Sequence, residues 1–169
     1  CTAIDVVNVG KYLVVPEDAE LPVGIDEEAV IIRQPILNVH SSSENALHML
    51  QMIIGDDPEP EITVAAWDYT APDYTTLLLN ACDLAIMPEI FAEPDEGEEP
   101  LTEEVTAAIA DVHERLDMLG IPMFVDRSAD EETEAAKLEW IKVYGILLGC
   151  EEAANTCYET AVAALEVQA

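Results

Sequence analysis

The segment Gly120–Asn155 constrains the fold more than any other part of the chain, because its residue types change in the order strand, polar turn, helix. The run from Ile121 to Val125 is apolar throughout and predicts a buried parallel strand. The polar turn Asp126-Arg127-Ser128 follows it directly. Open α/β sheets bind their ligands beyond the carboxyl ends of the strands. The segment therefore predicts a parallel-sheet domain with a ligand loop at this turn.

Two helices are expected after this turn. Asp130, Glu131 and Glu132 place negative charge where the positive end of a helix would begin, and Gly149 is a typical helix stop. The sequence accordingly predicts helices over 130–148 and 151–167.

The rest of the chain repeats the alternation of strand and helix. We predict further strands at 35–39, 61–67 and 84–87, and further helices at 45–54, 74–80 and 101–119. Alternation of this kind favours a three-layer α/β fold, in which helices flank both faces of a mainly parallel sheet of four or five strands.

The first 34 residues follow a different pattern. Tyr12–Val15 and Ala29–Ile32 are short apolar runs that a polar, Pro-containing link separates. They are expected to form a hairpin or edge strands. The predicted organisation is thus a single domain over 1–169, with an extended edge segment at 1–34 and an α/β core at 35–149.

Several motifs resemble one protein family. The stretches GIPMFVDRS, LEWIKVYGILLG and EEAAN within 120–155 are similar to extracytoplasmic solute-binding proteins of ABC importers for ferric siderophores, haem and cobalamin. PILNVHSSSENALHML at 35–50 is similar to the first strand, Ser-rich turn and first helix of that family, and DYTTLLLNACDLAI at 73–86 to its next helix, Asp and strand. The resemblance implies a periplasmic-binding-protein-like lobe.

The resemblance covers only the first of the two lobes of such importers, and residues 151–169 are similar to the beginning of the helix that joins the lobes. Two positions depart from the family pattern. Ala81-Cys82-Asp83 stands where the family usually has Lys-Pro-Asp. Thr75 stands where the family has a Glu that docks into the permease, which puts docking to an ABC permease through this residue in doubt.

The resemblance also implies a ligand-binding rim at the loops 40–43, 69–74, 88–91 and 126–128. A serine before a helix can present helix N–H groups to a ligand anion or simply cap the helix. Arg127 can bind a carboxylate or phosphate of a ligand, or pair with an acid of the domain. The predicted ligand-binding residues are Ser41, Ser42, Ser43, Tyr69, Tyr74, Glu89, Arg127 and Ser128.

Charge excludes some classes of partner. The 169 residues contain 36 acidic and 6 basic side chains, which give a formal charge of −30. Such a surface repels nucleic acids and anionic lipid headgroups. Both a halophilic setting and an ordinary acidic secreted protein fit this composition. The chain is nevertheless 50% hydrophobic, which argues against disorder.

Catalytic and metal-binding patterns are weak. The sequence has no GxSxG, Walker or GxGxxG motif, so no enzyme activity is expected. His40, His48 and His113 lack the spacing of a metal site, and we predict neither a metal nor a cofactor of the protein itself, although the ligand can carry iron or cobalt. Trp140 is expected in the core, and the cysteines are expected to be buried rather than paired in a 150–157 disulfide.

The sequence-based hypothesis is therefore an extracytoplasmic lobe that captures a small metal chelate for transport. Cys1 fits the lipid-modified Cys of a bacterial lipoprotein, or it reflects only where the chain was cut. Two alternatives remain open. One is a structural or interaction domain that kept the fold without the ligand, and the other is an acidic surface domain that collects cations.

Overall fold

The computed structural model describes residues 1–55 and 61–169. Two sheets and five α-helices make up this part of the chain, together with the short 3-10 helices η1 (Glu89–Phe91) and η2 (Ser128–Asp130). The strands are β1 (Thr2–Val6), β2 (Gly10–Pro16), β3 (Val30–Gln34), β4 (Asn38–Ser41), β5 (Thr63–Ala66), β6 (Leu84–Met87) and β7 (Met123–Val125). The helices are α1 (Glu44–Ile54), α2 (Tyr74–Leu79), α3 (Glu103–Met118), α4 (Glu134–Leu148) and α5 (Glu151–Gln168).

The larger sheet is fully parallel, with the strand order β5-β4-β6-β7. Its central strand β6 is buried at every position. Leu84 and Ile86 face one hydrophobic cluster, and Ala85 and Met87 face the other. A strand that is buried on both faces needs apolar residues at consecutive positions, which is why this run could be predicted from the sequence.

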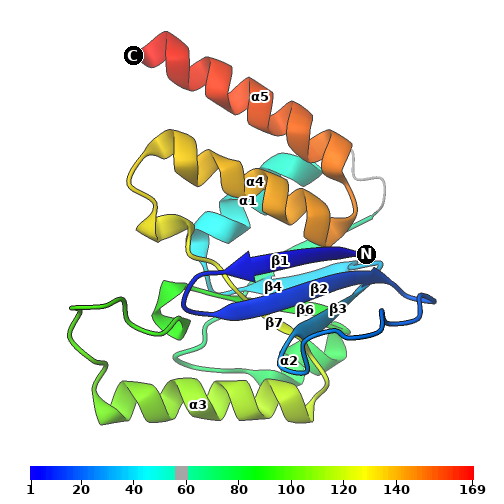
Figure 1. Cartoon of the computed structure of the whole chain (residues 1–169), viewed down its shortest axis with the longest axis vertical. Helices are drawn as coiled ribbons and strands as arrows, with labels where there is room; N and C mark the ends of the chain where they lie inside the picture. Colours follow the sequence, from blue (N-terminus) through cyan, green and yellow to red (C-terminus); the bar gives the residue numbers. More distant parts are fainter. Residues whose placement is uncertain (56–60) are drawn as a thin grey trace.

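Helices cover both faces of this sheet, as Figure 1 shows. α1 and α4 contribute to the cluster that contains Leu84, Ile86 and Phe124. α2 and α3 contribute Leu77, Val112 and Leu116 to the other cluster. α5 stacks against the outer side of α4. The predicted three-layer α/β architecture is confirmed.

The first 34 residues form a sheet of their own, which corrects the prediction that they add an edge strand or hairpin to the main sheet. β1 and β2 form an antiparallel hairpin, and β2 pairs with β3 in parallel. The two apolar runs detected in the sequence, now in β2 and β3, are therefore not hairpin partners. The missing partner was β1, whose mostly exposed residues carry no apolar run.

Tyr12 of β2 joins the small sheet to the free edge of the main sheet. Its ring packs on Phe124 with a centroid separation of 4.7 Å. Its hydroxyl accepts a hydrogen bond of 3.2 Å from the backbone N–H of Val125 in β7. An unpaired N–H on an edge strand is a liability when it is buried, and here a side chain of the other sheet satisfies it. Burial raises the pKa of Tyr12 to about 12.

Two of the predicted starts differ from the structure by three or more residues, each for a local reason. The strand expected at 35–39 begins only at Asn38, because the carboxylate of Asp83 accepts the N–H groups of Leu37 and Asn38 at 2.9 Å each. The helix expected at 130 begins at Glu134, because Thr133 caps it by accepting the N–H of Ala136.

Replacement of Gly145 by Ala tests the packing of α5 on α4. A Cβ at Gly145 would lie 2.4 Å from the Cβ of Ala154, so the two helices would have to move apart. Alanine is the better helix former by about 1 kcal/mol, but overpacking typically costs about 1–3 kcal/mol. We expect Gly145→Ala to lower the thermal midpoint and the double variant Gly145→Ala/Ala154→Gly to recover most of it. A single variant as stable as the parent would contradict this contact.

Replacement of Tyr12 by Phe tests the link between the sheets. An unfolded Tyr ionises near its ordinary pKa of 10.0, whereas the folded group stays protonated up to about 12. The contribution of Tyr12 to the free energy of unfolding is therefore complete below pH 10. It falls by about 2–3 kcal/mol in total as the pH rises toward 12.

Tyr12→Phe should lower stability by about 1 kcal/mol at pH 7, because Val125 loses its acceptor. The variant should then lose less stability than the parent between pH 10 and 12, as measured by urea denaturation. Burial also raises the pKa of Tyr144, which is present in both proteins, so its contribution cancels in the difference except for the small part that comes from Tyr12 itself. Identical losses in the two proteins would contradict the assignment.

Candidate functional site

The carboxyl ends of the four parallel strands meet at one edge of the main sheet. Backbone hydrogen bonds continue past the strands there: Ser42 donates to Ile86, Trp67 to Ser41 and Asp126 to Met87, each at 2.8 Å. The strand order reverses at β4, whose two neighbours are β5 and β6. Its trailing loop enters α1 on one face of the sheet, while the loops after β5 and β6 lead to α2 and α3 on the other. Such a reversal is where open α/β sheets form ligand crevices.

A groove of about 330 Å³ lies at the ends of β4 and β5. The hydroxyl of Ser42 donates a 2.5 Å hydrogen bond to the carbonyl of Trp67 across its floor. Tyr69 stands beside it, and its ring meets Phe91 edge to face at 5.1 Å. The groove is lined by Ser41, Ser42, Ser43, Glu44, Leu47, Ala66, Trp67, Asp68 and Tyr69.

A buried carboxylate connects this groove to the turn after β7. Asp126 is only 1% exposed. One of its oxygens accepts the hydroxyl of Ser43 at 2.5 Å, and the other accepts the N–H of Ser128 at 2.9 Å. Ser43 also caps α1, since its Oγ accepts the N–H of Ala46 at 3.1 Å. The loops after β4 and β7 are thereby held together in one arrangement.

The hydroxyls of the three serines are largely committed to the fold. Ser41 Oγ donates to the carbonyl of Ser43 and accepts the N–H of the same residue. Ser43 caps α1, which is one of the two roles that the sequence analysis gave to a serine before a helix. Of the three, Ser42 is the least buried. It is the serine best placed to meet a ligand in the groove.

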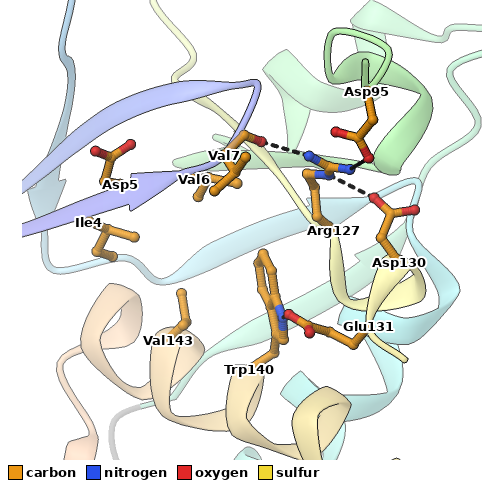
Figure 2. Close-up of a pocket in the computed structure, with 10 residues that line it drawn as sticks. All are labelled: Ile4, Asp5, Val6, Val7, Asp95, Arg127, Asp130, Glu131, Trp140 and Val143. Atoms are coloured by element: carbon orange, nitrogen blue, oxygen red, sulfur yellow. Dashed lines mark hydrogen bonds and ion pairs between the residues drawn. The ribbon is translucent and has the colours of Figure 1, made fainter. Parts of the chain in front are cut away.

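Arg127 forms an ion pair within the domain. Its Nε donates to Asp130 at 2.6 Å, its Nη2 to Asp95 at 3.0 Å, and its Nη1 to the carbonyl of Val7 at 2.8 Å (Figure 2). Partial burial lowers the pKa of Arg127, but the hydrogen bonds that it donates to the two carboxylates, together with their charge, outweigh this effect and leave the pKa raised. Of the two sequence-based interpretations, the structure thus shows the intradomain ion pair.

The eight predicted residues do not share one cavity. Ser41, Ser42, Ser43 and Tyr69 line the groove, whereas Glu89 and Arg127 line a separate depression of about 310 Å³. The hydroxyl of Ser128 is completely buried, beside a cavity of about 170 Å³. Tyr74 packs on Trp67 in the cluster under α2 and α3, with its hydroxyl buried. The side chains that converge at the groove are therefore half of the predicted set.

Sequence reasoning missed two residues of this region. Asp126 was read as part of a polar turn, but its buried side chain organises the rim. Trp140 was expected in the core, but it is only partly buried and lines a further cavity of about 430 Å³. Its ring meets Phe124 of the core edge to face at a centroid separation of 6.4 Å, so Trp140 packs on the cluster without being enclosed by it.

The other candidates gather into no metal centre in the described residues. His40 is 2% exposed, and burial lowers its pKa. In residues 1–55 and 61–169, no three His, Cys, Asp or Glu side chains are placed to hold a metal ion. The four cysteines are all free. Within the same residues, no helix is long and apolar enough to cross a bilayer.

Comparison with known proteins gave little. No protein-family model matches the chain, and no curated protein matches it. A crystal structure of a possible iron-binding (periplasmic solute-binding) protein from Staphylococcus epidermidis is similar, with a TM-score of 0.47 and 13% sequence identity. The match covers 75% of this chain and 48% of that protein, so the chain spans about half of its length. A likeness this remote establishes neither a family nor a function.

Replacement of Ser43 by Ala tests the buried link at the rim. The variant loses a helix cap, which costs about 1 kcal/mol, and leaves one oxygen of the buried Asp126 without its donor, which costs about a further 1–3 kcal/mol. Thr133→Ala is the matched control, because Thr133 caps α4 through the same 3.1 Å bond with no buried carboxylate attached. Denaturant titration should show a clearly larger loss for Ser43→Ala. Equal losses would mean that the Asp126 link contributes nothing.

Proposed function

We propose that this chain is an extracytoplasmic solute-binding lobe that holds a small molecule against the carboxyl edge of its parallel sheet. The groove at the ends of β4 and β5 is the observation that carries the proposal. It lies at the strand where the order of the sheet reverses, and it combines hydrogen-bonding groups of Ser42 and Tyr69 with the apolar faces of Trp67 and Leu47. Sites for small molecules typically combine an apolar lining with a few polar groups.

The negative charge of the groove favours some ligands over others within the class suggested by the sequence. Among the residues that the structure describes, Glu44 and Asp68 line the groove, and no basic side chain does. Arg127, the expected anchor for an anion, is held by two carboxylates elsewhere. Among iron-siderophore, haem and cobalamin ligands, we therefore favour a neutral or cationic chelate over one with free carboxylates, such as haem with its propionates.

The groove forms one wall only, so a lone lobe should bind reversibly and weakly. Closure of a second lobe over the ligand would exclude water and strengthen the contacts. In a transport system the partner would be an ABC permease. Thr75 is exposed on α2 and carries no charge, so docking there would rely on neighbouring acids.

One observation favours the alternative of a structural or interaction domain. The hydroxyls of Ser41 and Ser43 and the guanidinium of Arg127 are already bonded within the fold. A domain that had lost its ligand would keep these bonds and leave the groove empty.

Titration of the isotope-labelled protein with cyanocobalamin, a neutral ferric hydroxamate and haem separates the two functions. The indole N–H resonance of Trp67, a residue of the groove, should shift saturably with one of the first two ligands. Tyr69→Ala should weaken that binding by about 1–2 kcal/mol, roughly tenfold. Tyr158→Ala removes a tyrosine from the distant α5 and should change nothing. Absence of saturable binding by all three ligands would favour the structural alternative.

A further inference from the structure

A second cavity, distinct from the groove, lies between β1 and α4. Its volume is about 430 Å³. Ile4 and Val6 of β1 form one wall, and Val143 and the indole of Trp140 form the opposite wall on α4, as Figure 2 shows. Apolar walls of this extent can accommodate the hydrocarbon part of a small organic molecule.

The charge at the mouth of this cavity is negative. Asp95, Asp130 and Glu131 stand there with a single basic residue, Arg127. Asp95 and Asp130 are ion-paired with Arg127, and Asp95 is also hydrogen-bonded to the amide of Asn8. With Asp5 on β1, four carboxylates line the cavity against one guanidinium, so the net charge is negative and an anionic ligand is disfavoured.

Asp5 and Glu131 are the two carboxylates of the cavity that these pairs leave over, and Glu131 is the one bonded to the indole of Trp140. Among the ion pairs of residues 1–55 and 61–169, none involves Glu131. One of its oxygens accepts the indole N–H of Trp140 at 2.9 Å, which fixes the orientation of the ring. An oriented indole face beside an uncompensated carboxylate matches the two attractions that an ammonium group experiences in proteins, a cation–π contact and a charge contact.

We propose that this cavity binds an organic ammonium ion, with the ammonium group between Trp140 and Glu131 and the hydrocarbon part against Ile4, Val6 and Val143. Arg127 acts as a positioning residue: it holds Asp95 and Asp130 and the carbonyl of Val7, and so joins the loop after β1 to the turn after β7. The site shares no residue with the groove, and it is independent of the transport proposal.

Choline and dimethylbutanol, its uncharged carbon isostere, are suitable probes because they differ in the ammonium charge and little in shape. The full chain would be isotope-labelled and titrated at about 0.3 M NaCl, where the screening length of about 6 Å suppresses the field of distant acids. Trp140→Phe assigns the two indole N–H resonances. Choline should shift the Trp140 resonance saturably and leave that of Trp67 in place, whereas dimethylbutanol should bind about tenfold more weakly.

Glu131→Gln is the decisive variant, because glutamine can still accept the indole N–H but has no charge. It should weaken choline binding about tenfold. Glu132→Gln removes the same charge from the exposed neighbouring residue and should leave the affinity unchanged.

Absence of saturable binding, equal affinities for the two probes, or equal losses in the two variants would each overturn the proposal. A ligand of the groove is expected to shift only the Trp67 resonance, and choline only the Trp140 resonance. The failure of one site can therefore be distinguished from the failure of the other.

Discussion

The buried carboxylate of Asp126 is the interaction on which the arrangement of the candidate site depends. A carboxylate that is almost fully buried is costly unless donors surround it. Here the donors come from Ser43 at the start of α1 and from the backbone of Ser128 after β7. Movement of either loop alone would leave one oxygen of the buried carboxylate without its donor. The rim is therefore held by a polar requirement, in addition to the packing of the sheet beneath it.

The excess of acidic residues affects which contacts the few basic residues make. The chain has 36 acids for 6 basic side chains, and four of those six form an ion pair with a carboxylate of the described residues. Arg127 satisfies two of them and a backbone carbonyl, and thus serves the fold before any ligand. The same imbalance leaves carboxylates such as Glu131 without a cation. In a protein of this composition, open charged positions at a cavity tend to be acidic, which favours cationic and neutral ligands over anions.

The parallel sheet and its helices could be predicted from the sequence because they depend on local patterns. The apolar run of β6, the cap Ser43 and the stop at Gly149 are all visible in single stretches of sequence. The candidate site was predicted only in part, because it depends on contacts between distant residues. Nothing near Arg127 in the sequence indicates Asp95 or Val7, and nothing in the mostly exposed β1 indicates that it completes a separate sheet. The division of the chain into one lobe and the start of a joining helix stays a prediction.

Native-state amide hydrogen exchange tests the role of Asp126 most directly. The N–H of Ser128 is bonded to Asp126, and the N–H of Ala46 is bonded to Ser43, so each reports on one end of the link. If the link holds the rim as one unit, both amides exchange with the same opening free energy, close to that of the amides in β6. Rapid exchange of Ser128 by a local opening, while Ala46 stays as protected as β6, would contradict this account.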